Sequence, residues 1–363
     1  MSLRVLTSVD VRNITSKLSP ELLQSLMEDV FALISSSDTG NESSYTPHRT
    51  SIPTENHTTL FMPGRISNIG TTMKVVSVPS NPDDTRGLPA STLVLDKDTG
   101  AVKAIVNARS LTALRNAAGS LLSTTLVGPV SPVHIAAFGA GAQIIAHLDL
   151  HLQVFASVKS CTIINRTLNA RVSAVASELQ LKHPSVKISV LASASREEVR
   201  TSLSTASIII TATPSRVPLF PSSWVRSGTH VILIGSYTPQ MKEVDTDLIM
   251  RAIPKEGNSL VDSVLACFTE AGELLEANLH SDQVVEIGEL VLEKRANSEA
   301  SSWRDSRELA EQSDDFNGPI TVFKSVGVGL QDVAIACAVV DKAEELERLS
   351  ADGSVGVVVK SFD

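Results

Sequence analysis

The sequence predicts a two-domain α/β protein, with a doubly wound parallel sheet in the middle of the chain and an α+β domain formed by the flanking residues. Three observations lead to this prediction. Short apolar segments alternate with helical patterns between residues 133 and 236, a pair of glycines ends the first of these segments, and residues 1–125 lack the alternation. A chain of 363 residues is long enough for two domains.

Composition narrows the class of protein. Hydrophobic residues make up 42% of the chain and charged residues 20%, which is typical of a globular protein with a substantial core. The net charge of -9 argues against nucleic acid or an anionic membrane as the main partner. No apolar run approaches the ~20 residues that span a bilayer, and the N-terminal segment lacks the apolar core of a secretory signal. Cys161, Cys267 and Cys337 follow no metal-ligand spacing. They indicate buried thiols in a reducing compartment, so we expect a cytoplasmic protein without a metal site.

The first 125 residues combine a helix with antiparallel strands. Ser19 and Pro20 precede apolar residues at helical spacing, which predicts a helix over 19–34, and a polar loop follows over 35–47. Four strand-like segments come next: "TLFMPGRI", "TTMKVVSV", "ASTLVLD" and "AVKAIVN". A turn at residues 98–100 joins the last two as a hairpin.

The middle of the chain contains five apolar segments that read as buried strands, at residues 133–138, 161–165, 186–192, 207–213 and 230–236. Amphipathic or polar helical patterns separate them. Strands that are apolar throughout and alternate with helices indicate a parallel sheet that is covered on both faces.

Gly139 and Gly141 end the first of these strands and open the helix that follows. This is where a Rossmann-type domain binds a dinucleotide: the first glycine permits a tight turn, the second lets the backbone approach the pyrophosphate, and the positive N-terminus of the helix supports its charge. Ile144 replaces the third small residue of the fingerprint. In this context the glycines predict a dinucleotide site.

The residues after the second strand select the cofactor. An acidic residue there would bind the ribose 2′-hydroxyl of NAD(H). This chain has Asn165, Arg166 and Thr167 instead. Arg166 can pair with a 2′-phosphate, so the sequence favours NADPH over NADH. The alternative is that Arg166 is a solvated surface residue.

The sequence resembles the ornithine cyclodeaminase/mu-crystallin family almost from end to end. The segments "TPHRTSI", "LFMPGR", "MKVVSV" and "LVLDKDTGAVKAIVNARSLTALRNAA" match its first domain, and "FGAGAQ", "INRT", "ITATPS" and "IGSYTPQMKEVD" match its nucleotide domain. "VDSVLACFTEAGEL", "EIGELV" and "TVFKSVGVGLQDVAIA" complete the match. The resemblance implies a discontinuous substrate and dimerisation domain at 1–125 with 325–363, a Rossmann domain at 126–324, and a homodimer.

The resemblance also implies the site residues. Arg49, Lys74 and Arg115 match positions that hold the substrate carboxylate near the reacting imine. Each of these cations, considered alone, is also compatible with a surface ion pair. The residues expected to line the cofactor are Gly139, Gly141, Ala142, Gln143, Asn165, Arg166, Thr167, Thr211, Ala212, Thr213, Ser236 and Val326.

Tyr237 stands where deaminating members of the family have a catalytic aspartate. Glu243 and Asp245 lie nearby and are alternatives for that carboxylate, but both match general family positions and are expected to have structural roles. The departure favours NAD(P)H-dependent reduction of a small imine or ketimine that bears a carboxylate, or the reverse oxidation of an amino acid. The alternatives are an ornithine cyclodeaminase, which converts ornithine to proline and ammonia with NAD, and a non-catalytic binder of NADPH and a small molecule.

Four further features receive less specific interpretations. His147 and His151 share one helix face, which we assign to solvent rather than to a metal. His48, beside Arg49, is expected to have a packing or loop role. The polar segment 292–320 is expected to be a surface excursion, with a lid or a partner surface as alternatives. The apolar residues 355–359 are compatible with an added edge strand.

Overall fold

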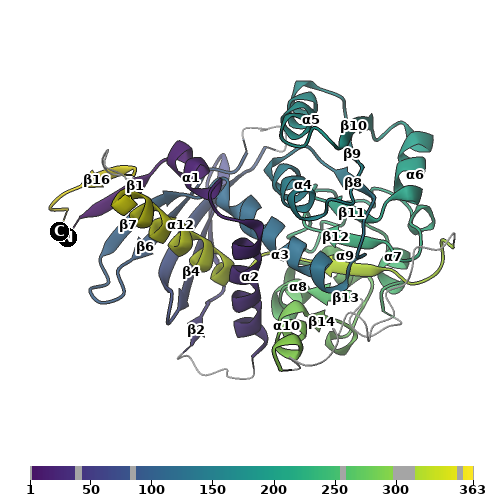
Figure 1. The fold of residues 1–363 in the computed structure, drawn as a ribbon. Coiled ribbons are helices and arrows are strands. Elements are labelled where there is room, and N and C mark those ends of the chain that lie inside the picture. Colours follow the sequence, from purple (N-terminus) through teal and green to yellow (C-terminus); the bar gives the residue numbers. More distant parts are fainter. Residues whose placement is uncertain are drawn as a thin grey trace. The chain divides into compact units, whose positions relative to one another are not determined.

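The chain forms two compact units (Figure 1). The computed structural model describes residues 2–36, 43–81, 87–253, 259–296, 315–349 and 355–362. Unit 1 comprises Met1–Leu33, Ser37–Arg115 and Val328–Asp363, and unit 2 comprises Ile34–Ser36 and Asn116–Gly327. Unit 1 is therefore discontinuous in sequence.

Unit 1 is built on an eight-stranded mixed sheet in the order β16-β1-β7-β6-β5-β4-β2, with β3 also paired to β4. The β1–β7 pair is parallel and the other pairs are antiparallel. The strands are β1 (Leu3–Leu6), β2 (Ser44–Tyr45), β3 (Thr50–Pro53), β4 (His57–Ile66), β5 (Gly70–Pro79), β6 (Ala90–Leu95), β7 (Val102–Asn107) and β16 (Val357–Val359).

One face of this sheet is covered by the long helix α12 (Gly329–Leu349), which packs against β4, β5, β6 and β7. Burial alternates along β5, as expected for a strand with one covered face. Gly64 of β4 lies where a Cβ would come within 2.8 Å of Val333 Cγ2, so α12 sits close to the strand backbone. The short helix α1 (Ser8–Thr15) and the longer helix α2 (Pro20–Ser35) lie between β1 and β2 in the sequence.

Unit 2 is built on an eight-stranded sheet in the order β10-β9-β8-β11-β12-β15-β13-β14, and every pair in it is parallel. The strand order reverses between β8 and β11, which makes that junction a topological switch point. The strands are β8 (His134–Phe138), β9 (Ser160–Asn165), β10 (Lys187–Ala192), β11 (Ile208–Thr211), β12 (His230–Leu233), β13 (Ser259–Val261), β14 (Val285–Glu286) and β15 (Thr321–Lys324).

Helices connect these strands (Figure 1). They are α4 (Ala142–Val154), α5 (Ala170–Lys182), α6 (Arg196–Thr205), α7 (Thr246–Met250), α8 (Val264–Glu270), α9 (Gly272–Glu276) and α10 (Ile287–Ala296), with short 3₁₀ turns at Ser222–Trp224 and Ser281–Gln283. Helix α3 (Leu111–Val127) begins in unit 1 and continues in unit 2.

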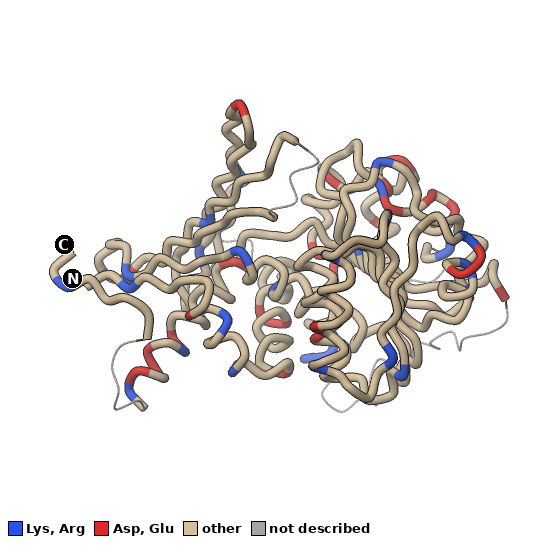
Figure 2. The backbone as a smooth tube through the Cα atoms, turned by 90° about the horizontal axis from the view of Figure 1, so that it is seen from above, with Lys and Arg blue, Asp and Glu red and all other residues tan. Residues whose placement is uncertain are grey.

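Charged residues gather on the helices and loops rather than in the parallel sheet (Figure 2). Strands β8, β9, β11, β12 and β13 contain no Asp, Glu, Lys or Arg, and the charged residues of the sheet lie at strand ends: Lys187 of β10, Glu286 of β14 and Lys324 of β15. In the part of the chain that the structure describes, no helix is long and apolar enough to cross a membrane.

The predicted fold class is confirmed: a doubly wound parallel sheet accompanies an α+β unit. The helix at 19–34, the four strands of unit 1, the five strands between 133 and 236 and the edge strand near residue 357 are all present. The sequence did not predict β1, β3, β13, β14, β15, α1, α3 or α7 to α10. The predicted loop over 35–47 contains β2, and its residues 37–42 lie outside the described residues. Most of the polar segment 292–320 lies outside the described residues, except for the end of α10 and residues 315–320.

Candidate functional site

The turn after β8 has the geometry of a dinucleotide cradle. Gly139 follows the last residue of the strand and has a φ of 114°, a conformation that favours glycine. A Cβ at this position would lie 3.0 Å from the carbonyl oxygen of Ala212 and 3.5 Å from Ile144 Cγ1. The neighbouring backbone therefore approaches too closely to leave room for a side chain.

The N-terminus of α4 leaves polar groups available to an anion. Gly141 is its N-cap and provides no side-chain hydrogen bond, so the first backbone N–H groups of the helix have no capping side chain. Within the described residues, the buried Gln143 Oε1 has no hydrogen-bond partner. Ile144, at the third position of the fingerprint, is fully buried. Uncapped N–H groups at a positive helix end, beside a close glycine turn, fit a dinucleotide pyrophosphate.

The segment after β9 presents cations and no carboxylate. Asn165 Nδ2 donates to the carbonyl of Thr167 at 2.8 Å and closes the turn, while Arg166 and Thr167 are exposed. Arg171, one residue into α5, places Nη2 3.5 Å from where a Cβ of Gly141 would lie. Arg171 is thus a second cation beside the glycine turn. We did not anticipate it, because a Rossmann fingerprint directs attention only to the residues immediately after the strand.

The remaining expected cofactor residues lie at or just after the carboxyl ends of β11, β12 and β15. Ala212, Thr213 and Val326 are partly exposed, whereas Thr211 and Ser236 are buried. The two buried side chains take part in an internal network, so their hydroxyls have protein partners. Open α/β sheets bind ligands outside the carboxyl ends of their strands, at the topological switch point.

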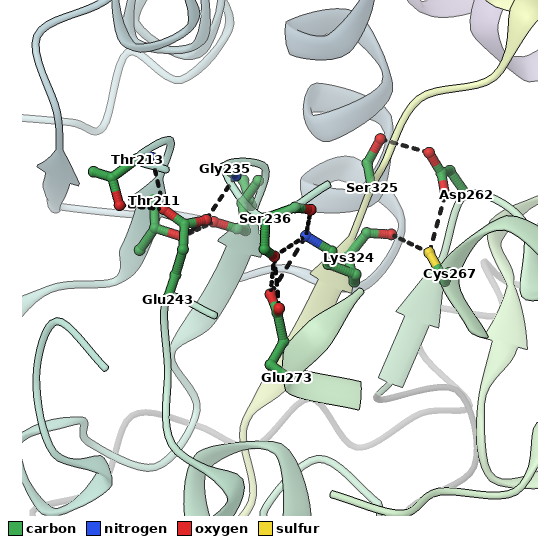
Figure 3. A network of polar contacts seen from close by, with 11 residues as sticks. Thr211, Thr213, Gly235, Ser236, Glu243, Asp262, Cys267, Glu273, Lys324 and Ser325 are labelled. Atoms are coloured by element: carbon green, nitrogen blue, oxygen red, sulfur yellow. Dashed lines mark hydrogen bonds and ion pairs between the residues drawn. The ribbon is translucent and has the colours of Figure 1, made fainter. Parts of the chain in front are cut away.

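A network of charged side chains lies beneath these strand ends (Figure 3). Lys324, at the end of β15, donates to the carbonyl of Ser236 at 2.7 Å and lies 3.3 Å from Glu273 Oε1. Ser236 Oγ donates to the same carboxylate at 2.6 Å. Asp262 Oδ2 accepts from Ser325 Oγ at 2.6 Å and from the Gly327 backbone at 2.7 Å. The segments after β12 and β15 are therefore each attached to a buried carboxylate.

Unit 1 has its own buried cluster of charges. Lys74 of β5 and Arg115 of α3 are 2% and 3% exposed. Lys74 Nζ donates to Asp332 Oδ2 at 2.9 Å, and Arg115 Nε lies 3.3 Å from Asp332 Oδ1. Arg115 Nη1 also donates to Gln331 Oε1. Two of the three predicted cations thus share one carboxylate of α12.

Burial lowers the pKa of Lys74 below that of an ordinary lysine. Asp332 opposes this shift, and the positive charges of Arg115 and Arg49 add to it. Arg49 therefore lies within electrostatic range of Lys74, and it is partly buried in the loop before β3. The structure brings the three predicted cations into one electrostatic cluster, whereas His48 is exposed beside it.

The assignment of His147 and His151 to a solvated face was wrong, because both are fully buried. His147 Nε2 pairs with Ser120 Oγ and His151 Nε2 with Thr124 Oγ1, each at 2.9 Å. Burial lowers their pKa values to about 3 and about 4. The sequence around Ser120 and Thr124 contains no pattern that identifies their hydroxyl groups as partners of the two histidines. No group of three or more His, Cys, Asp or Glu is placed to hold a metal among the described residues.

The fold and these clusters define an α/β protein with a dinucleotide-type glycine turn in unit 2 and a buried cluster of cations around Asp332 in unit 1. The sequence profile of the ornithine cyclodeaminase/mu-crystallin family matches residues 4–347. The chain therefore belongs to the ornithine cyclodeaminase/mu-crystallin family.

Relatives of the chain include named reductases. It is 31% identical over 265 residues to a Delta(1)-pyrroline-2-carboxylate reductase of Colwellia psychrerythraea, covering 71% of this chain and 75% of the relative. It is 28% identical to the ketimine reductase mu-crystallin of Mus musculus, covering 69% of each chain. A Thermococcus litoralis Delta(1)-pyrroline-2-carboxylate reductase, solved with NADH and L-proline, has the same fold: the TM-score is 0.75 at 24% identity, covering 94% of this chain and 98% of that one.

Proposed function

We propose that the protein uses NADPH to reduce the C=N bond of a small imino acid or cyclic ketimine carboxylate, and that the reverse reaction oxidises the corresponding amino acid. The observation that carries this proposal is the buried Lys74–Asp332–Arg115 cluster, in a chain whose other unit contains a dinucleotide-type glycine turn.

The cluster suits a carboxylate. Arg49, Lys74 and Arg115 supply three positive charges and Asp332 supplies one negative charge, which leaves an excess of two positive charges. A planar guanidinium can hold a carboxylate through two parallel hydrogen bonds. Gln331 and Asp332 hold the Arg115 guanidinium, so little side-chain entropy remains to be lost when an anion binds.

Lys74 suits the transfer of a proton to the substrate nitrogen. When bound, NADPH would supply a hydride to the imine carbon, and the nitrogen must then gain one proton. An ammonium group whose pKa is lowered by burial is a better acid than an exposed lysine, and Asp332 orients it from 2.9 Å. Burial also limits the access of water to this proton.

Reduction fits the residues better than cyclodeamination does. Tyr237 occupies the place of the aspartate that the family's deaminating members use, and it directly follows the buried Ser236. A tyrosine side chain cannot replace a carboxylate as a base at neutral pH, because a free phenol has a pKa of about 10. The named reductases among the relatives support the same choice.

NADPH fits the cation-rich segment after β9 better than NADH does. Arg166 is exposed directly after β9, the segment that contacts the ribose in Rossmann domains, and Arg171 adds a second cation near the glycine turn. An acidic residue, which would repel a phosphate, is absent from residues 165–171.

A homodimer fits the second face of the unit 1 sheet. The residues that alternate with those facing α12 include Phe61, Met73, Val75, Leu93 and Ile105, and all are only partly buried. A row of apolar side chains across neighbouring strands is typical of a protein interface. The same face on a second copy would provide a self-complementary partner.

The test is consumption of NADPH with a panel of cyclic imino acids, at mildly acidic pH, comparing the wild-type protein with Lys74→Ala. The wild-type protein should turn over at least one imine, and Lys74→Ala should lose about 100-fold or more of kcat, because it removes the proton donor. Lys97→Ala, at a lysine whose side chain is 75% exposed, is the matched control and should be unchanged.

No turnover with any imine despite tight NADPH binding would reject the reductase proposal for those substrates. Release of ammonia from ornithine with NAD would then identify a cyclodeaminase, and its absence would leave a binding protein.

A further inference from the structure

Glu243 is a fully buried carboxylate that connects two segments of unit 2 (Figure 3). Its Oε1 accepts from the Thr213 backbone N–H at 2.7 Å and from Thr213 Oγ1 at 2.9 Å. Its Oε2 accepts from the Gly235 backbone N–H at 2.6 Å and from Thr211 Oγ1 at 2.8 Å. Each oxygen thus binds one backbone group and one hydroxyl.

The two segments are the continuations of β11 and β12 beyond their last ladder pair, Thr211 with Leu233. The backbones remain very close there, since a Cβ on Gly235 would lie 2.0 Å from the Thr213 carbonyl oxygen. The two N–H groups that Glu243 binds belong to residues outside the strands. The carboxylate therefore replaces the ladder at the point where the chains leave the sheet.

The segment that Glu243 holds also forms one side of the glycine turn. Ala212 N donates to the carbonyl of Phe138 at 3.1 Å, and the Ala212 carbonyl would lie 3.0 Å from a Cβ on Gly139. Thr213 Cγ2 would lie 3.5 Å from the same atom. A shift of residues 211–213 would therefore change the shape of the cradle.

A buried carboxylate is costly unless its oxygens are fully bonded. Burial raises the pKa of Glu243, as does the charge of Glu273, while Lys324 and the bonds from Thr213 and Thr211 lower it. The four hydrogen bonds use the lone pairs of both carboxylate oxygens, so Glu243 has no acceptor position left for a substrate.

We propose that Glu243 is a positioning residue for the dinucleotide: it fixes the spacing between residues 211–213 and Gly235 and thereby the shape of the cradle at Gly139. This inference rests on the proposed function, because it assumes that the glycine turn binds a dinucleotide. Glu243 acts through backbone groups and contacts neither substrate nor cofactor.

The test is Glu243→Gln, a change of nearly constant volume. Each carboxylate oxygen accepts from a backbone N–H group. In either orientation of the glutamine amide, its NH₂ group would therefore face one of these N–H groups, and that hydrogen bond would be lost. We expect the Kd values for NADPH and NADH, measured by nucleotide fluorescence, to rise by the same factor of about tenfold or more, since a hydrogen bond to a charged group is lost. The matched control is Glu276→Gln, at an exposed glutamate that pairs with Lys242.

Deuterium uptake by the nucleotide-free protein provides a readout that does not depend on cofactor. In Glu243→Gln, exchange should rise in peptides covering residues 211–215 and 233–237 and stay unchanged in α5 and α6. Uniformly faster exchange would indicate general destabilisation and would overturn the positioning role.

Thr211→Val serves if Glu243→Gln fails to fold, since it removes one hydroxyl bond and keeps a β-branched residue in the strand. It should raise both Kd values severalfold. If the folded variants bind nucleotide as the wild type does, Glu243 has no positioning role, although the proposed function stands. If the wild-type protein binds neither nucleotide, the proposed function fails and this inference fails with it.

Discussion

Arg166 follows the last residue of β9 and is exposed, so its charge is available to a ligand. Arg166→Ala should raise the KM for NADPH about tenfold, because a charge-assisted hydrogen bond to the 2′-phosphate is lost. The KM for NADH, which has no 2′-phosphate, should change little. Steady-state kinetics with both nucleotides measure the two KM values and their ratio.

Arg200→Ala is the control for this comparison, at an exposed arginine on α6. Equal losses with NADPH and NADH in the Arg166 variant would contradict a role in 2′-phosphate recognition.

Site residues that belong to a sequence motif could be predicted from the sequence. Residues whose role depends only on contacts made in the folded protein could not. Lys74 and Arg115 follow from the family resemblance. Asp332, which holds both of them, lies 258 residues after Lys74, and its position in the helical sequence carries no chemical signature. For Glu243, a structural role was expected, but its four hydrogen bonds depend on two separate strand ends.

At the scale of elements, the open face of the unit 1 sheet leads to a prediction about assembly. Leu93 lies within β6 and is partly exposed on the side away from α12. Leu93→Glu should convert a homodimer to monomers, because a charge in the centre of an apolar interface is poorly solvated. Size-exclusion chromatography with light scattering measures the mass.

Leu181→Glu, at an 84% exposed leucine on α5, is the matched control and should leave the mass unchanged. A wild-type protein that is already monomeric at high concentration would contradict the proposed dimer.

Long patterned elements were predictable, and short ones were not. The alternation in β5 and the apolar segments of the parallel sheet extend over enough residues to reveal their period. Strand β14 has two residues and β13 has three, which is too few for a pattern. Helix α1 could have been found, because Thr7 and Asp10 form a capping box that is visible as a Thr-x-x-Asp sequence.

At the scale of the molecule, buried histidines make stability depend on pH. Burial lowers the pKa values of His147, His151 and His230 to about 3, 4 and 3. Histidines in the unfolded chain take up protons below a pH of about 6.5, while the folded groups stay neutral. Their contribution is therefore complete above that pH and is lost as the pH falls toward the folded values. Glu243 opposes this trend, because its pKa is raised.

We expect the free energy of unfolding to fall by about 4 kcal/mol between pH 6.5 and 5. Denaturant titrations across this range measure it. His230→Gln should reduce the slope of the unfolding free energy against pH by the equivalent of about one proton, because this histidine is neutral when folded and protonated when unfolded in this range. A slope that is identical in the wild-type protein and the His230 variant would show that His230 does not titrate differently on unfolding.

The discontinuity of unit 1 has a consequence for the order of events on the ribosome. The continuous segment 116–327 can fold as soon as it has been synthesised, but the sheet of unit 1 lacks its covering helix until residues 329–349 follow. Until then the nascent chain exposes the apolar face of β4 to β7, and Lys74 and Arg115 have no Asp332 beside them. A chain that is released early would keep unit 2 but would lack Asp332 beside Lys74 and Arg115, and the uncovered sheet of unit 1 would be a target for chaperones and proteases.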